Sequence, residues 1–142
     1  MVCLVTKEYG NPVLYTANVG DSRAVLKQGK AGALRLSTDH RPCEREELER
    51  IARVGGVIMG GRVGGSLAIT RALGDHMLFK SGVIPNPSIS RHELKPSDKY
   101  LILASDGVWD AMSDEVGRER DGCRRRSCWL MKMQERTWWR SA

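Results

Sequence analysis

The stretch that decides the fold is Leu101-Ile102-Leu103-Ala104-Ser105-Asp106-Gly107-Val108-Trp109-Asp110. Its apolar first half predicts a buried strand, and this strand ends in an aspartate followed by a glycine. A carboxylate at the end of a buried strand is a hard oxygen ligand held in one place, which suits Mg²⁺ or Mn²⁺. We expect Gly107 to permit a backbone turn that a larger residue would resist. Asp106 is therefore a candidate metal ligand.

A second segment has the same order of features: Asn18-Val19-Gly20-Asp21-Ser22-Arg23-Ala24-Val25-Leu26. Strands are predicted over residues 13–19 and 23–27, joined as a β-hairpin across Gly20-Asp21-Ser22. Asp21 is a second candidate carboxylate, although an aspartate in a hairpin turn is also ordinary turn chemistry.

The remaining pattern predicts an α+β fold, with strands in hairpins and one inserted helix. The helix is expected over residues 43–54, with Asp39 or His40 near its cap and Gly55-Gly56 at its end. A second helix, capped by Ser113, is expected to begin at residues 114–116. The other extended segments are predicted at residues 2–6, 33–36, 57–59, 66–70, 88–94 and 100–105.

Length and composition indicate one soluble globular domain. The chain has 142 residues, and no apolar stretch approaches the length of a membrane span. The four cysteines, at positions 3, 43, 123 and 128, show no disulfide or zinc spacing. We therefore expect reduced thiols in an intracellular protein, cytoplasmic or nuclear.

The net charge of +6 is concentrated in the last part of the chain. Residues 117–142 hold eight Lys or Arg against three Asp or Glu, together with three of the four tryptophans. This basic, Trp-rich tail is expected to lie outside the fold of residues 1–116. One interpretation is a basic patch that contacts nucleic acid or an anionic membrane. The abrupt change in composition favours the other interpretation, an accidental extension without a role of its own.

Three further motifs follow in a fixed order: Thr38-Asp39-His40-Arg41-Pro42, Glu49-Arg50-Ile51 with Gly55-Gly56, and Arg62-Val63-Gly64-Gly65-Ser66-Leu67-Ala68-Ile69-Thr70-Arg71-Ala72-Leu73-Gly74-Asp75. Together with the two aspartate segments, they resemble the PP2C family of metal-dependent protein serine/threonine phosphatases. Several motifs in register are far more specific than one short pattern. The resemblance extends over residues 1–116.

The resemblance implies a partial α-β-β-α sandwich and hydrolysis of phosphoserine and phosphothreonine by a metal-activated water. Two Mg²⁺ or Mn²⁺ ions would lower the pKa of that water and neutralise phosphoryl charge. Asp106 matches the metal-ligand aspartate of the family's Ala-Ser-Asp-Gly motif, and Asp21 matches the aspartate of its Gly-Asp-Ser motif, which is associated with a weaker third metal. Gly107 follows the first ligand and would keep bulk away from the ion.

The family's Asp-Gly-His-Gly-Gly segment and its late Asp-Asn motif have no counterpart here. The chain is therefore expected to be truncated at both ends, and Asp106 and Asp21 are not expected to hold a two-metal centre alone. No catalytic residue beyond these ligands, and no substrate-binding residue, is identified.

The other polar residues of these motifs have structural explanations. His40 is interpreted as a turn or cap residue rather than a general acid. Arg62, Arg71 and Asp75 are interpreted as a buried ion pair or loop anchor. Residues 60–65 lack the ending of a phosphate-binding loop and are interpreted as a glycine-rich connection.

The expected partner is a phosphoprotein substrate; no specific nucleic acid and no transmembrane segment are expected. Self-association through exposed sheet edges is also expected. The alternatives are a non-catalytic phosphatase-derived module that binds or regulates, and a nucleic-acid or membrane binder that acts through the tail.

Overall fold

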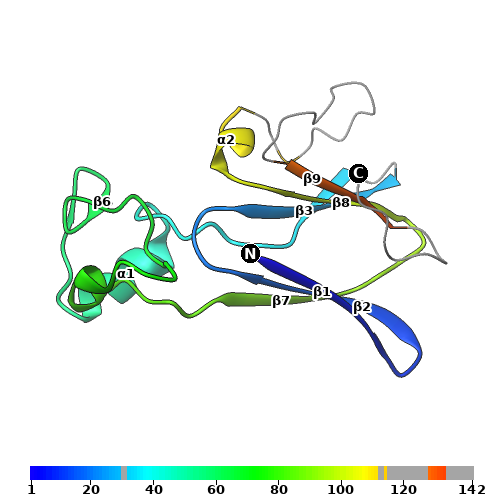
Figure 1. The fold of residues 1–142 in the computed structure, drawn as a ribbon, viewed down its shortest axis with the longest axis horizontal. Helices are drawn as coiled ribbons and strands as arrows, with labels where there is room; N and C mark the ends of the chain where they lie inside the picture. The colour runs from blue at the N-terminus through cyan, green and yellow to red at the C-terminus, as the bar shows by residue number, and fades with distance from the viewer. Residues whose placement is uncertain (30–31, 112–113, 115–127, 134–142) are drawn as a thin grey trace.

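Two antiparallel sheets form the body of the protein, seen as two layers in Figure 1. The fold comes from a computed structural model that describes residues 1–29, 32–111, 114 and 128–133. One sheet has the order β1 (Val2–Glu8), β2 (Asn11–Asn18), β7 (Ser88–Glu93). The other has the order β4 (Gly32–Arg35), β3 (Arg23–Gln28), β8 (Asp98–Ala104), β9 (Cys128–Lys132).

The core lies between these sheets because alternate residues of each strand point to opposite faces. Leu14 of β2 packs in one cluster with Leu26 of β3 and Leu101 of β8. All three are at most 1% exposed. Cys3 and Val5 pack at the margin of the same cluster.

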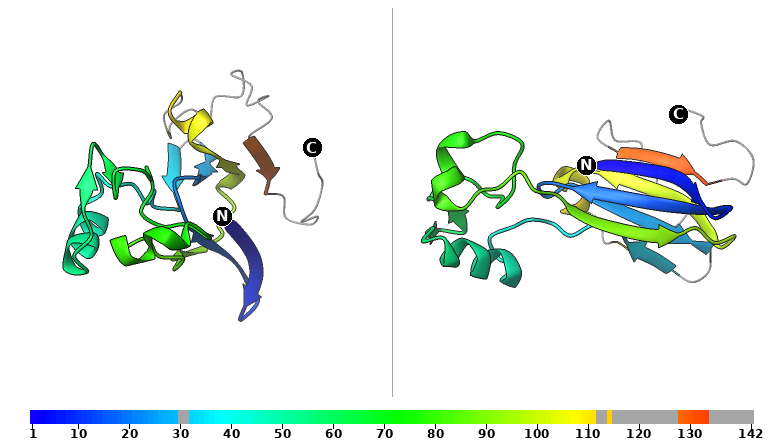
Figure 2. Two further views of the ribbon diagram at one scale, coloured as in Figure 1. Left: turned by 60° about the vertical axis from the view of Figure 1, so that its left-hand side comes forward. Right: turned by 90° about the horizontal axis from the view of Figure 1, so that it is seen from below.

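A separate lobe lies beside the sandwich, at the left of Figure 1 and in both views of Figure 2. It contains α1 (Arg45–Arg53), the short hairpin of β5 (Ile58–Met59) with β6 (Arg62–Val63), and the 3-10 helix η2 (His76–Ser81). The lobe has its own buried cluster, formed by Ile51, Val63, Ala72 and Val83.

The α+β class is confirmed, and α1 lies within the predicted range 43–54. The helix ends as expected: Gly55 has a left-handed φ of +76°, and its N–H donates to the Ala52 carbonyl at 3.0 Å. The Gly56 N–H donates to the Ile51 carbonyl, also at 3.0 Å. This is the glycine-terminated ending that satisfies the last carbonyls of a helix.

The predicted hairpin across Gly20-Asp21-Ser22 is wrong. β2 pairs with β1 and β7, whereas β3 pairs with β4 and β8. The three residues cross from one sheet to the other, because each strand finds its partners elsewhere in the chain.

Two other local predictions are wrong. Residues 66–70 form no strand; Leu67 makes only an isolated bridge to Val63, and it packs with Ile69 against the core of the lobe. Asp39 and His40 do not cap α1, whose N-cap is Glu44. Their side chains are buried and bind β3 and the crossing between the sheets instead.

Part of the tail joins the sandwich, contrary to the expectation that residues 117–142 lie outside the fold. Strand β9 extends the second sheet by pairing with β8, with Leu130 opposite Ile102. The domain boundary at residue 116 stays a prediction, and the helix expected from Ser113 falls outside the described residues. Cys3 and Cys43 are free thiols. No helix in the described part of the chain has the length and apolar character needed to span a membrane.

Candidate functional site

Asp106 lies where β8 ends and α2 (Asp106–Trp109) begins. Its side chain is exposed, and its Oδ1 accepts a hydrogen bond from the Gly107 N–H at 2.8 Å. The expectation that Gly107 permits a turn which a larger residue would resist is wrong, because the φ of Gly107 is not in the left-handed region. A Cβ added there would meet only the Ser105 Oγ, at 4.0 Å. The site therefore has open space at Gly107, but no conformation that requires glycine.

Asp21 lies on the crossing from β2 to β3, immediately after Gly20. Here the glycine is required: Gly20 is buried and has a φ of +96°, which L side chains rarely adopt. The Asp21 side chain is 25% exposed. A backbone conformation that favours glycine was expected at Gly107, beside Asp106. It is found at Gly20, beside Asp21.

The two candidate carboxylates lie at the same edge of the second sheet, because Arg23 and Ala104 are paired in neighbouring strands. Burial raises the pKa of Asp21, and the negative charge of Asp106 raises this pKa further. A carboxylate whose ionisation is disfavoured by a neighbouring negative charge lies in a local excess of negative charge. A cation placed between Asp21 and Asp106 would be favoured.

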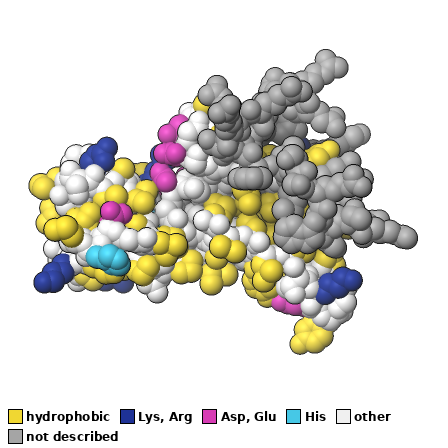
Figure 3. Space-filling model, viewed as in Figure 1, with side chains coloured by type: hydrophobic (Ala, Val, Ile, Leu, Met, Phe, Trp, Pro, Cys, Tyr) yellow, Lys and Arg dark blue, Asp and Glu magenta, His cyan; other side chains and the backbone are white. Residues whose placement is uncertain are grey.

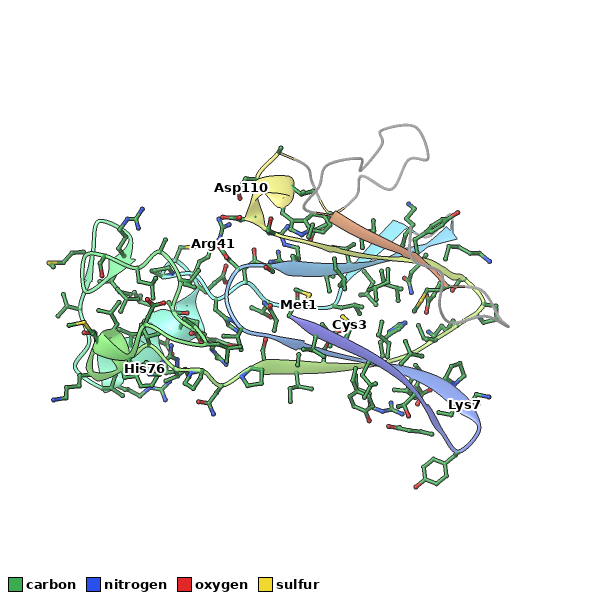
Figure 4. All side chains as sticks on the ribbon, in the orientation of Figure 1. Met1, Cys3, Lys7, Arg41, His76 and Asp110 are labelled. Carbon is green, nitrogen blue, oxygen red and sulfur yellow. The ribbon has the colours of Figure 1, made fainter. Side chains whose placement is uncertain are left out.

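Arg41 supplies positive charge at this place. Its Nη2 lies 3.4 Å from Asp21 Oδ2 and 3.2 Å from Asp110 Oδ1. Figure 4 labels Arg41 and Asp110, which lie near each other between the lobe and α2, and acidic side chains gather in the same region of Figure 3. Asp110 was missed by the sequence reasoning. Its position four residues after Asp106, at the end of a helical turn, is the signal that places it near that residue.

Trp109 fixes the start of β3 against the end of β8. Its indole Nε1–H donates to the Ala104 carbonyl at 3.0 Å and to the Arg23 carbonyl at 3.2 Å. The guanidinium of Arg23 lies 5.4 Å from the centre of the same ring. Since Ala104 precedes Asp106 and Arg23 follows Asp21, this one side chain restrains both candidate ligands.

Asp39 holds Arg23 from the other side. Arg23 Nη2 lies 2.6 Å from Asp39 Oδ2, and Arg35 Nη2 lies 2.5 Å from Asp39 Oδ1. Burial alone would raise the pKa of Asp39, but the bonds from the two arginines outweigh it and lower this pKa. Asp39 is therefore an ionised structural residue in the folded protein.

The other motif residues are explained by contacts in the lobe. Arg71 pairs with the buried Glu47, and Arg62 Nη1 donates to the Ser66 carbonyl at 2.8 Å. Asp75 is exposed, with a left-handed φ of 54° at the start of η2. Thus Arg71 belongs to a buried ion pair and Arg62 anchors a loop, as expected.

The described residues do not form a complete metal centre. They contain no group of three or more His, Cys, Asp or Glu side chains arranged to hold an ion. Magnesium and manganese usually need several oxygen ligands in near-octahedral geometry. Asp21 and Asp106 therefore remain predicted ligands, and no reaction step is derived through a metal at this edge.

The sequence is similar to known phosphatases over most of its length. The profile of the family described as "Protein phosphatase 2C" matches residues 1–119. Protein phosphatase 2C homolog 1 of Saccharomyces cerevisiae is 47% identical over 102 residues, which cover 72% of this chain and 36% of the yeast protein. Protein phosphatase 2C 56 of Arabidopsis thaliana is 49% identical over 109 residues, covering 75% of this chain and 25% of that protein.

Solved structures show the same fold. A phosphatase from a pathogenic strain of Toxoplasma gondii superposes with a TM-score of 0.65 at 34% identity, covering 75% of this chain and 35% of that one. A Caenorhabditis elegans sex determining protein superposes with a TM-score of 0.64 at 30% identity, covering 70% and 25%. The chain spans about a third or less of the lengths of these relatives. With a profile match over residues 1–119 and the two-sheet fold in common, the chain belongs to the protein phosphatase 2C family.

Proposed function

We propose that this chain supplies part of the catalytic domain of a metal-dependent protein phosphatase, which hydrolyses phosphoserine and phosphothreonine in proteins. The observation that carries the proposal is that Asp21 and Asp106 flank the paired residues Arg23 and Ala104, at the same end of neighbouring strands β3 and β8. Membership of a family whose curated members are named protein phosphatases supports the reaction class.

In this proposal Asp21 and Asp106 contribute carboxylate oxygens to a Mg²⁺ or Mn²⁺ site. A metal of this kind would lower the pKa of a bound water and neutralise phosphoryl charge. The chain's own contribution is to hold the two carboxylates at one edge of the sandwich, through Trp109 and the Gly20 turn. Two ligands alone predict weak binding, since hard cations usually take six or more oxygens.

The metal role is tested by adding Mn²⁺ to the ¹⁵N-labelled chain and observing paramagnetic broadening. We expect the amide signals around Asp21 and Asp106 to broaden first, and Asp106→Asn to abolish this selectivity. Asp75→Asn is the matched control, because Asp75 is an exposed aspartate of the separate lobe. Uniform broadening, unchanged in Asp106→Asn, would refute the assignment.

The reaction is tested by hydrolysis of a phosphothreonine peptide with Mn²⁺ and with EDTA. Turnover that requires Mn²⁺ and is lost in Asp106→Asn would establish that this chain is itself a phosphatase. Binding of the peptide by folded protein, without turnover, would favour a second candidate: a non-catalytic phosphatase-derived module. The incomplete ligand set among the described residues is the observation that favours this alternative.

A further inference from the structure

His40 forms two hydrogen bonds with the backbone of Gly20. The His40 N–H donates to the Gly20 carbonyl at 3.0 Å, and the Gly20 N–H donates to the His40 Nδ1 at 3.2 Å. Both residues are buried, with His40 only 1% exposed. One residue thus binds both polar groups of the glycine that precedes Asp21.

The second of these bonds fixes the chemical state of the imidazole. Because Nδ1 accepts a proton donor, the ring must be neutral and carry its own proton on Nε2. Nε2 is buried and has no hydrogen-bond partner in the described part of the protein. Burial and the nearby positive charge of Arg71 lower the pKa of His40, with Arg50 acting in the same direction and Glu47 in the opposite one.

The surrounding contacts restrain the same turn from both sides. Asn18 Nδ2 donates to the Gly20 carbonyl at 3.1 Å and to the Thr38 carbonyl at 2.9 Å. Asp39, the neighbour of His40, binds Arg23 at the far end of the crossing. The segment from Thr38 to His40 therefore restrains the crossing before and after Asp21.

We propose that His40 is a positioning residue, whose neutral imidazole holds the Gly20 turn so that the Asp21 carboxylate lies beside Asp106. The inference rests on the proposed function, because it assigns His40 a purpose only where Asp21 is a metal ligand. It gives a task to a buried histidine that contacts neither candidate ligand directly. Protonated histidine cannot perform this task, since Nδ1 would then be a donor facing the Gly20 N–H.

The test compares two amides that replace the ring. In His40→Asn the amide can place an oxygen where Nδ1 lies, so the bond from the Gly20 N–H is retained. In His40→Gln the amide reaches the position of Nε2, so that bond is lost. We expect His40→Gln to weaken Mn²⁺ binding at Asp21 about tenfold, as for other groups that orient metal ligands, and His40→Asn to stay within about threefold of wild type. The readouts are Mn²⁺ broadening of the Asp21 amide and hydrogen exchange of the Gly20 amide, which should accelerate only in His40→Gln.

Equal Mn²⁺ affinities for wild type and a folded His40→Gln would overturn the proposal. Equal losses in both variants would do the same, because they would indicate a merely structural role. Absence of Mn²⁺ binding to the wild type would instead refute the proposed function, and with it the purpose assigned to His40. Hydrogen exchange of the Gly20 amide would still report whether the bond between Gly20 and His40 exists.

A measurement on the wild type covers the case in which neither variant folds. The Gly20 nitrogen and the His40 Nδ1 should show scalar coupling through their hydrogen bond in a ¹⁵N spectrum, with the His40 proton on Nε2. A ring protonated on Nδ1 at neutral pH would overturn the proposal.

Discussion

Arg71 Nη2 lies 2.6 Å from Glu47 Oε1. Glu47 belongs to α1, and its carboxylate is almost completely buried. Oε2 of the same carboxylate accepts from the Thr70 hydroxyl at 2.6 Å and pairs with Arg50 Nη2 at 2.8 Å. Arg50 also donates to the Thr70 and Gly82 carbonyls. One carboxylate therefore joins the helix of the lobe to the segment that leads into η2.

Removing this charge is expected to destabilise the chain strongly. Glu47→Gln leaves Arg50 and Arg71 without their common counter-ion, which at buried pairs costs about 3–5 kcal/mol. Glu49→Gln is the matched control on the same helix, because its partner Arg45 has a 90% exposed side chain. Exposed pairs of this kind contribute about 0.5 kcal/mol. Denaturant unfolding measures both values, and equal losses for the two variants would contradict the interpretation.

The same carboxylate predicts a pH dependence. Burial alone would raise the pKa of Glu47, but bonds from Arg71, Arg50 and Thr70 hold this pKa well below its ordinary value of 4.5. Since the folded-state pKa is depressed, the stabilisation is fully present above pH 4.5 and is lost as the pH falls below it. The difference in unfolding free energy between wild type and Glu47→Gln should therefore shrink on acidification. A constant difference between pH 6 and pH 3 would contradict this.

Asp106→Asn is expected to stabilise the metal-free chain. The pKa of Asp21 is raised by burial and by Asp106, so ionising Asp21 costs stability as the pH rises above its ordinary value of 3.8. Removing the second charge should increase the unfolding free energy at neutral pH and low salt, by about 0.5 kcal/mol for such partly exposed groups.

With Mn²⁺ the order of stabilities should reverse. A ligand at one hundred times its Kd stabilises the state that binds it by about 2.7 kcal/mol. Mn²⁺ should therefore raise the melting temperature of the wild type and leave Asp106→Asn nearly unchanged. Equal shifts for the two proteins would argue against a metal site at Asp106.

Gly56 is expected to tolerate no side chain. A Cβ at this position would lie 2.2 Å from the Ser81 carbonyl oxygen and 2.7 Å from Ile51 Cγ2. Gly56→Ala should cost about 1–3 kcal/mol, as overpacking of a close contact does. Gly107→Ala is the control, because its Cβ would enter open space without a positive φ. If thermal melts show the two variants to be equally stable, α1 and Ser81 do not lie as close as the structure has them.

The sequence predicts most reliably those elements whose hydrogen bonds join residues close together in the chain. The period of apolar residues and Gly55 together predict α1, because a helix closes its own hydrogen bonds. The Gly20 crossing could not be predicted, since β2 pairs with β7, which lies 70 to 80 residues later, and no local signal encodes that pairing. Asp106 and Asp21 were identified through short motifs, and the spacing of Asp110 from Asp106 is also a local signal, whereas the position of His40 depends on packing between distant segments.

Self-association of the isolated chain stays a prediction, and the first sheet suggests where to test it. Val2, Leu4 and Ile89 are 66%, 58% and 69% exposed. The strand register places them on one face, with Val2 and Ile89 on either side of Ala17. Sedimentation velocity should show association that weakens in Leu4→Lys, because a charge on this face opposes burial of it. A wild type that stays monomeric at high concentration would contradict the prediction.

The crossing between the sheets makes the spacing of Asp21 and Asp106 independent of the thickness of the sandwich. Asp21 lies two residues before β3 and Asp106 two residues after β8, and Arg23 pairs with Ala104 where these neighbouring strands of the second sheet meet. The register of one strand pair, rather than the packing between the two layers, therefore sets where the carboxylates lie. Core side chains that move the two layers apart would thus leave the two candidate ligands beside each other.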